Sequence, residues 1–282
     1  MKASKSMKIF GFLVRLSPYL RFALIRWVYD KYASHNYSEK NIFLNYGYHD
    51  DTHLSLHEQD EPNRLFIQLY HRTVQNLDLQ NKDIVEVGSG QGAGGIFLSE
   101  YHNPRSYRGI DLSKKAIAFC QRHNQNPHIE WKQGSADQLP IPNESADVVI
   151  NIESSHLYPS MDRFIGEVRR ILRPHGYMAF ADLRPHSQVG ALEKCFRDSG
   201  FRIITRSDIT PQVLASLTLI SDRRKAHITA TYPKILRQAA QEMSAVKGTP
   251  IYNSFINSQQ KYLCYLLQKQ SSTGNEYAYQ QP

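Results

Sequence analysis

The segment DIVEVGSGQGAGG, residues 83–95, joins an apolar run to a burst of glycines. A chain does this where a buried strand turns sharply and lets its backbone lie against a ligand. Two spacings overlap there: Gly90–Gly95 fits the dinucleotide pattern G-x-G-x-x-G, and Glu86–Gly92 fits acid-x-G-x-G-x-G. The first spacing predicts a hydride carrier such as NAD. The second predicts S-adenosylmethionine and the transfer of a methyl group.

Neighbouring acids help to separate these two cofactors. Asp111 fits both, because a carboxylate at the end of the second strand can hold a ribose diol in either case. Glu86 favours the methyl donor, since an acid is unfavourable beside a pyrophosphate and favourable beside an ammonium and a sulfonium. The loop QGSADQLPI can present the Ala136 N–H and the Asp137 carboxylate to an adenine edge. Each acid alone has a structural alternative, backbone hydrogen bonding for Glu86 and helix capping for Asp137, but their order along the chain favours methyl transfer.

The loop NIESSHLYP, residues 151–159, holds candidate catalytic residues. Methyl transfer to a hydroxyl requires an aligned nucleophile and benefits from a general base. His156 is the candidate base, because imidazole accepts a proton near neutral pH. Asp182 ends the next apolar run at the same edge of the predicted sheet, and it can orient His156 or stabilise its cation. Glu153 can do the same or can contact the cofactor.

The segment NYGYHDD, residues 45–51, precedes the first strand. Tyr46 or Tyr48 can close over the methionine end of the cofactor, because an aromatic face attracts a sulfonium. The alternative is a plain aromatic turn, and the sequence leaves both open.

Apolar runs alternate with helical patterns from residue 83 onward, as a parallel sheet with helices on both faces requires. The predicted strands are 83–87, 106–111, 128–132, 146–152, 176–183, 201–207 and 261–267, and the predicted helices are 94–101, 113–122, 160–172 and 187–199. About fifty residues separate the last two strands, with helical character near 211–219 and 232–243. A long crossover before the last strand is consistent with a reversed final strand.

These elements suggest three regions. Residues 1–40 form basic, apolar N-terminal helices, residues 41–269 form the catalytic domain with a lid insert at 211–258, and residues 270–282 form a disordered tail.

The net charge of +8 is concentrated at the N-terminus, where seven Lys and Arg and one acid fall between Met1 and Lys31. The rest of the chain is close to neutral, which argues against a nucleic-acid substrate. Residues 1–35 are basic and aromatic, as in a helix at a membrane surface, although packing over the domain explains them too. Arginines and Pro18 interrupt the apolar run, so we expect no membrane span and a cytoplasmic protein with peripheral membrane contact. The three cysteines lack metal-ligand spacing, and we expect no metal requirement.

The ordered motifs VEVGSGQG, YRGIDLS, QGSADQLP, DVVINIESSHLYP and VRRILRPHGYMAFADLRP resemble those of class I S-adenosylmethionine-dependent methyltransferases. NIFLNYGYHDD, DEPNRLFIQLYHRT and NIESSHLYPSMDRF resemble the phthiotriol/phenolphthiotriol dimycocerosate methyltransferases, which O-methylate a hydroxyl of a long-chain polyketide lipid. The resemblance spans 41–269 and implies a Rossmann-like seven-stranded sheet with a helical lid from the N-terminus and the insert. Two motifs depart from the common GCGxGGG and GDAE forms, and Ser135 replaces an acid.

The resemblance implies an S-adenosylmethionine site built from Glu86, Gly88, Ser89, Gly90, Gln91, Asp111, Leu112, Ala136, Asp137, Asn151 and Tyr46. We therefore predict an S-adenosylmethionine-dependent O-methyltransferase acting on a hydroxyl of a lipid, polyketide or other small molecule. The alternatives are a fatty-acid carboxyl O-methyltransferase, which needs no base, an NAD-dependent oxidoreductase, and a non-catalytic adaptor.

Overall fold

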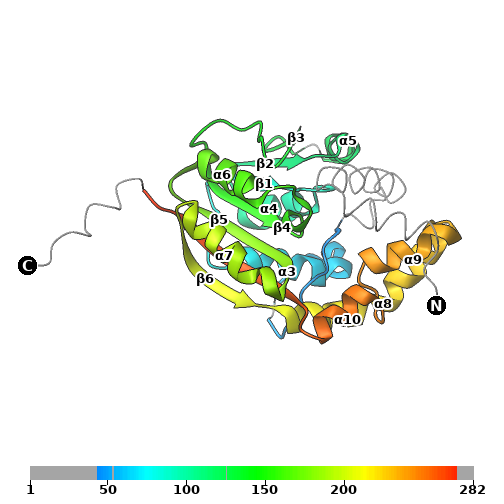
Figure 1. Cartoon of the computed structure of the whole chain (residues 1–282). Coiled ribbons are helices and arrows are strands. Elements are labelled where there is room, and N and C mark those ends of the chain that lie inside the picture. Colours follow the sequence, from blue (N-terminus) through cyan, green and yellow to red (C-terminus); the bar gives the residue numbers. More distant parts are fainter. Residues whose placement is uncertain (1–42, 53, 125, 272–282) are drawn as a thin grey trace, which may run out of the picture.

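Seven strands form a single sheet in the computed structural model, which describes residues 43–52, 54–124 and 126–271 (Figure 1). The strands are β1 (Asp83–Val87), β2 (Ser106–Asp111), β3 (Ile129–Gln133), β4 (Ala146–Ile152), β5 (Leu172–Pro185), β6 (Phe201–Asp208) and β7 (Gln260–Lys269). Their order across the sheet is β3-β2-β1-β4-β5-β7-β6. Only β7 is antiparallel to its neighbours, β5 and β6. The predicted mostly parallel, Rossmann-like sheet with a reversed last strand is therefore confirmed.

Helices cover both faces of this sheet. One face packs against α3 (Arg64–Val74), α4 (Ala93–His102) and α5 (Lys114–His123), and the other against α6 (Met161–Ile171) and α7 (Val189–Asp198). Alternating strand residues divide between the two cores: Ile84 joins the first cluster, and Val85 and Val87 join the second. Both faces of the central strands are buried, which explains their nearly continuous apolar sequences.

Serine side chains cap the N-termini of α5 and α6. The hydroxyl of Ser113 accepts a hydrogen bond from the Ala116 N–H and caps α5, whose start agrees with the predicted helix 113–122. Ser160 caps α6 in the same way through the Arg163 N–H. These caps place the segments that precede each helix at the carboxyl edge of the sheet.

The insert before β7 contains α8 (Thr210–Thr231), α9 (Lys234–Met243) and α10 (Pro250–Ile256). The three helices lie together at one end of the molecule, coloured yellow to orange in Figure 1. They share a small apolar cluster of their own, made by Ile228, Tyr232, Ala240 and Val246. The sequence predicted helical character for α8 and α9 but not for α10, although Thr249 caps it and Pro250 occupies its first turn.

Two further elements differ from the sequence-based prediction. β5 begins at Leu172 and not at residue 176, because Leu172 already pairs with Ala146, and the register shifts between Ala146 and Val148. Helix α3 was not predicted as an element. The predicted N-terminal helices at 1–40, their membrane contact through 1–35 and the tail beyond residue 271 lie outside the described residues. Within the described ranges, no helix combines the length and apolar character needed to span a bilayer.

Candidate active site

The glycine turn after β1 is held by backbone hydrogen bonds to β2. The N–H groups of Gly88 and Ser89 both donate to the Ile110 carbonyl, at 2.8 and 3.0 Å. Gly88 has φ +80°, and a Cβ added there would lie 2.3 Å from Oγ of Ser154. Any side chain at Gly88 would therefore be strained and would collide with the loop after β4.

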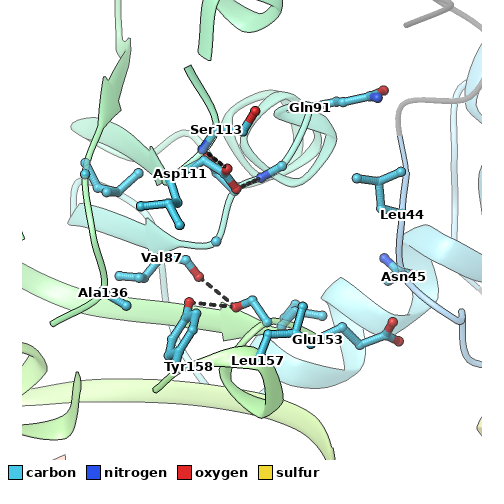
Figure 2. A pocket seen from close by; sticks show the side chains of 18 of the residues that line it. Leu44, Asn45, Val87, Gln91, Asp111, Ser113, Ala136, Glu153, Leu157 and Tyr158 are labelled. Atoms are coloured by element: carbon cyan, nitrogen blue, oxygen red, sulfur yellow. Dashed lines mark hydrogen bonds between the residues drawn. The ribbon is translucent and has the colours of Figure 1, made fainter. Parts of the chain in front are cut away.

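Asp111 fastens this turn to the end of β2. Its Oδ2 accepts from the Gly90 N–H at 2.9 Å, and its Oδ1 accepts from the Ser113 N–H at 2.8 Å (Figure 2). The carboxylate is thereby fixed at the point where β1 and β2 end. This is the position at which an open α/β sheet binds a ribose.

A cavity opens at this edge, between the ends of β1, β2 and β4. Its empty volume is about 1100 Å³ including the mouth, which is ample for a small-molecule ligand. Eight of the predicted site residues line it: Gly88, Ser89, Gly90, Gln91, Asp111, Leu112, Ala136 and Glu153. Asp111 and Ser113 form one side in Figure 2, Leu157 and Tyr158 the opposite side, and Leu44 and Asn45 a third wall.

Like Ser89, whose Oγ has no hydrogen-bond partner among the described residues, Gln91 is a buried polar residue of this wall. Its side chain is 2% exposed, and neither its amide oxygen nor its amide nitrogen has a hydrogen-bond partner among the described residues. Buried amides are normally paired, so an unpaired one lining a cavity is explained by a ligand that offers both a donor and an acceptor.

Glu86 lies beneath the glycine turn and not in the cavity wall. Its Oε1 accepts from the hydroxyl of Tyr70 at 2.8 Å, and its Oε2 accepts from the hydroxyl of Tyr107. Desolvation raises the pKa of Glu86 to about 7, Asp111 adds to the rise, and the two tyrosine hydrogen bonds oppose it. Tyr70 itself lines the cavity, so this tyrosine connects Glu86 to the cavity wall.

Glu153 follows β4 with φ +48°, in the left-handed region that a residue with a Cβ seldom adopts. Its Oε1 accepts from the Tyr46 N–H at 2.6 Å and from the Tyr262 hydroxyl at 2.7 Å. Desolvation raises the pKa of Glu153 to about 7, against the lowering effects of these donors and of Arg224. Glu153 is therefore an acid in the cavity wall whose protonation changes near neutral pH.

Tyr46 is placed against the insert helices, and its ring does not line the cavity. Its hydroxyl donates to the Met243 carbonyl at 3.1 Å, and the Arg224 guanidinium lies 5.6 Å from the ring centroid. Arg224 also donates to the carbonyls of Asn45 and Ser244, each at 2.7 Å. The segment that contains Tyr46 thus connects the cavity wall to α8 and α9.

His156 and Asp182 are brought together as the sequence predicted. Nδ1 of His156 lies 2.7 Å from Oδ1 of Asp182, whose side chain is completely buried. The His156 side chain is 28% exposed, so Nε2 is left for a partner from outside this pair. Burial would raise the pKa of Asp182, but the charges of His156 and Arg184 and the hydrogen bonds from His156 and Ser155 lower it below its usual range. Neither member of the pair is among the residues that line the cavity, although Ser154 and Leu157, on either side of His156, are.

Asp137 and Asn151 support neighbouring loops. Asp137 accepts a hydrogen bond from the Ser135 hydroxyl, and Ser135 and Ala136 line the cavity whereas Asp137 does not. Nδ2 of Asn151 donates to the Val87 carbonyl and to Oγ of Ser154, both at 2.8 Å. Asn151 therefore joins the loop after β4 to the end of β1.

Sequence reasoning did not assign several wall residues, namely Phe43, Leu44, Asn45, Tyr70, Ser113, Gly134, Ser154, Leu157, Tyr158 and Pro159. The signal for the last four was present, because they belong to the segment NIESSHLYP that was singled out for its histidine. Phe43, Leu44 and Asn45 reach the wall only through the tertiary path of the chain.

The described residues contain one group with potential metal ligands, formed by His57, Asp60 and Glu100. His57 and Glu100 are exposed, the group lies away from the cavity wall, and no role in the site follows from it.

Comparison with known proteins places the chain among methyltransferases. A family model described as a methyltransferase domain matches residues 85–180. The phthiotriol/phenolphthiotriol dimycocerosates methyltransferase of Mycobacterium leprae (strain TN) is 38% identical over 234 residues, which cover 82% of this chain and 87% of that protein. The fatty-acid O-methyltransferase of Mycolicibacterium smegmatis is 36% identical over 215 residues, covering 75% of this chain and 78% of that protein.

Solved structures share the fold at low sequence identity. The cyclopropane synthase MmaA2 from Mycobacterium tuberculosis has a TM-score of 0.67 at 16% identity, covering 85% of this chain and 97% of that one. Geranyl diphosphate C-methyltransferase from Streptomyces coelicolor A3(2), solved with S-adenosyl-L-homocysteine, has a TM-score of 0.62 at 14% identity, covering 86% and 98%.

Proposed function

The chain belongs to the family of the phthiotriol/phenolphthiotriol dimycocerosates methyltransferases, and from that premise we propose that it methylates a hydroxyl of a lipid or polyketide-like molecule. The methyl donor is S-adenosylmethionine, whose sulfonium supplies an activated methyl group. The protein therefore has to bind the donor, align the acceptor and accept the hydroxyl proton.

The cavity residues fit this cofactor. Asp111, fixed by two backbone N–H groups, would hold the ribose diol, and Ala136 and Leu112 would border the adenine. Gly88 leaves room for close approach of the ligand. The unpaired amide of Gln91 and the carboxylate of Glu153 would meet the methionine end, where the ligand carries a carboxylate and positive charges.

His156 is the proposed general base. Because Asp182 engages Nδ1, the neutral ring carries its proton there and presents Nε2 as the acceptor. Asp182 keeps the ring oriented and stabilises the imidazolium that forms when the hydroxyl proton is taken. Glu153 contributes a negative charge in the cavity wall rather than the base itself.

The absence of a cation from the described cavity wall favours a hydroxyl over a carboxylate as acceptor. Two acids, Asp111 and Glu153, line the cavity, whereas no Lys, Arg or His is among the described lining residues. A fatty-acid carboxylate would be desolvated there beside like charge, which is costly. A hydroxyl is neutral until it reacts. Carboxyl methylation remains the second candidate because a relative named fatty-acid O-methyltransferase matches most of the chain.

The surrounding segments suit a lipid acceptor. The insert at 211–258 would act as a lid, because Arg224 and Tyr46 join it to the cavity wall. The basic, apolar residues 1–35 would bring a cytoplasmic enzyme to the membrane surface where such a substrate resides.

Calorimetric titration with S-adenosylhomocysteine, with NAD as the control ligand, tests the cofactor assignment. We expect S-adenosylhomocysteine alone to bind the wild-type protein and Asp111→Ala to lose that binding. Binding of NAD, or unchanged binding in Asp111→Ala, would contradict the proposal.

A further inference from the structure

Arg184 lies behind the His156–Asp182 pair, two residues farther along β5. We propose that Arg184 is a positioning residue that acts through Asp182 and Ser155 to orient the ring of His156 and to oppose its protonation. The inference rests on the proposed function, in which His156 accepts the proton of the hydroxyl.

The guanidinium of Arg184 is buried, and both of its terminal nitrogens have partners among the described residues. Its side chain is 6% exposed, and Nη1 lies 3.0 Å from Oδ2 of Asp182. Nη1 also donates to the Leu183 carbonyl at 2.6 Å, and Nη2 donates to Oγ of Ser155 at 2.6 Å. The group is thus fixed in place and is not presented to a ligand.

Ser155 completes a closed network. Its hydroxyl accepts from Arg184 and donates to Oδ2 of Asp182 at 2.5 Å, while the His156 N–H donates to the same oxygen at 2.9 Å. Oδ2 of Asp182 is therefore directed toward Arg184 and Ser155, whereas Oδ1 accepts from the ring of His156 at 2.7 Å and from the Leu183 N–H at 2.8 Å. This division of the two oxygens determines the ring orientation.

The charge of Arg184 also affects the proton on His156. With Asp182 alone, protonation of His156 would take a buried pair from a net charge of −1 to 0, which is favourable. With Arg184 included, the same step takes the group from 0 to +1. A buried cation in the network therefore opposes the imidazolium and offsets part of the effect of Asp182.

Other ionisable groups interact with Asp182 across this region. Glu153 follows β4, Tyr46 and Tyr158 belong to the adjoining loops, and Tyr262 lies on β7. Glu153, when ionised, favours a protonated His156, whereas the three tyrosines are neutral at neutral pH. Arg184 is the permanent cation that contacts Asp182 in the described residues.

An NMR titration of the His156 ring, in protein saturated with S-adenosylhomocysteine, tests the inference directly. The His156 signal is assigned by its loss in His156→Asn. In Arg184→Gln we expect its titration midpoint to rise by about one pH unit, because a charge a few ångströms away has been removed. Arg184→Met, whose apolar chain can pack against Phe180 and Met161, serves if the Gln variant does not fold. Arg184→Lys keeps the charge and should leave the midpoint within about 0.3 unit of wild type.

The pH profile of kcat separates this inference from the proposed function. If Arg184→Gln also raises the pH at which kcat reaches half its maximum on the acidic side of the profile, the role of Arg184 and the role of His156 as the base are both supported. A risen NMR midpoint with an unchanged kcat profile supports the role of Arg184 and contradicts His156 as the base. An unchanged NMR midpoint in both neutral variants overturns the inference. Arg206→Gln is the matched control, since it removes an arginine of β6 that pairs with Glu193 of α7 at 2.7 Å, and it should shift neither readout.

Discussion

The backbone N–H of Tyr46 donates to Oε1 of Glu153 at 2.6 Å, although 107 positions separate the two residues. The bond joins the segment before α3 to the residue that follows β4. Tyr46 is in turn joined to the insert through the Met243 carbonyl. Glu153 therefore lies where the end of β4, the segment before α3 and, through Tyr46, the insert meet at the cavity wall.

We predict that binding of S-adenosylhomocysteine weakens as the pH falls through about 7. The ligand carries an ammonium that the ionised Glu153 favours, and the pKa of Glu153 is raised to about 7. If only the ionised form binds well, affinity at pH 6 is about tenfold lower than at pH 8. Calorimetry on wild type and Glu153→Gln measures this. The variant should bind more weakly and lose most of the pH dependence, while Glu130→Gln, an exposed acid on β3, should match wild type.

A second prediction concerns stability and Glu86. The pKa of a glutamic acid is ordinarily about 4.5, and burial raises that of Glu86 to about 7, so the folded chain holds an extra proton between these values. Stability therefore falls as pH rises from about 4.5 to about 7 and is level above it, a loss on the order of 3 kcal/mol. Glu86→Gln removes this loss and can still hydrogen-bond both tyrosines. In thermal melts, the melting temperature of Glu86→Gln relative to wild type should be higher at pH 8 than at pH 5. An equal difference at the two pH values would refute the account.

Gly94 is predicted to tolerate no side chain because of Tyr70. A Cβ at Gly94 would lie 2.1 Å from Cε1 of Tyr70, the ring that donates to Glu86 and lines the cavity. Gly94→Ala should cost about 1–3 kcal/mol of unfolding free energy and weaken binding of S-adenosylhomocysteine. Gly166→Ala is the matched control, since nothing lies within 4 Å of its added Cβ in helix α6. In denaturant unfolding, Gly166→Ala should have the same free energy of unfolding as wild type or a higher one. An equal loss of unfolding free energy in the two variants would exclude a steric role for Tyr70.

His156→Asn should separate proton transfer from binding. The asparagine amide can still donate to Asp182 but has nothing in place of Nε2. With a hydroxyl acceptor, kcat should fall by about 10²–10⁴-fold, and the affinity for S-adenosylhomocysteine should change little. Steady-state kinetics and calorimetry on the same preparation check both. A variant that keeps wild-type kcat would remove His156 from the mechanism.

The sheet and half of the site could be predicted because their signals are local. Gly88 and Asp111 stand at the ends of apolar runs, and the carboxyl ends of parallel strands meet at one edge. The wall formed by Leu44 and Asn45 could not be predicted, because the segment reaches the cavity through tertiary contacts with α3 and the insert. The sequence left open whether Tyr46 or Tyr48 closes over the cofactor or the segment is a plain aromatic turn, and the fold places the Tyr46 hydroxyl at the Met243 carbonyl.

The charged residues of the site could be found from the sequence, but their hydrogen-bond and ion-pair partners could not. Glu86 was identified by its spacing from Gly88, but only the fold reveals that Tyr70 and Tyr107 occupy its two oxygens. Asp182 was predicted to orient His156 from its position at the end of a strand. Arg184 stands two residues farther on in the same strand, and nothing in the local pattern indicates that its side chain turns back to Asp182.

Transfer of a labelled methyl group from S-adenosylmethionine to matched lipids tests the central proposal most directly. The acceptors are a long-chain secondary alcohol and the fatty acid of equal chain length, and the extracted product is treated with alkali. We predict label in an alkali-stable methyl ether, formed by wild type and lost in Asp111→Ala. Label only in an alkali-labile methyl ester would contradict the hydroxyl assignment and establish the carboxyl as the acceptor.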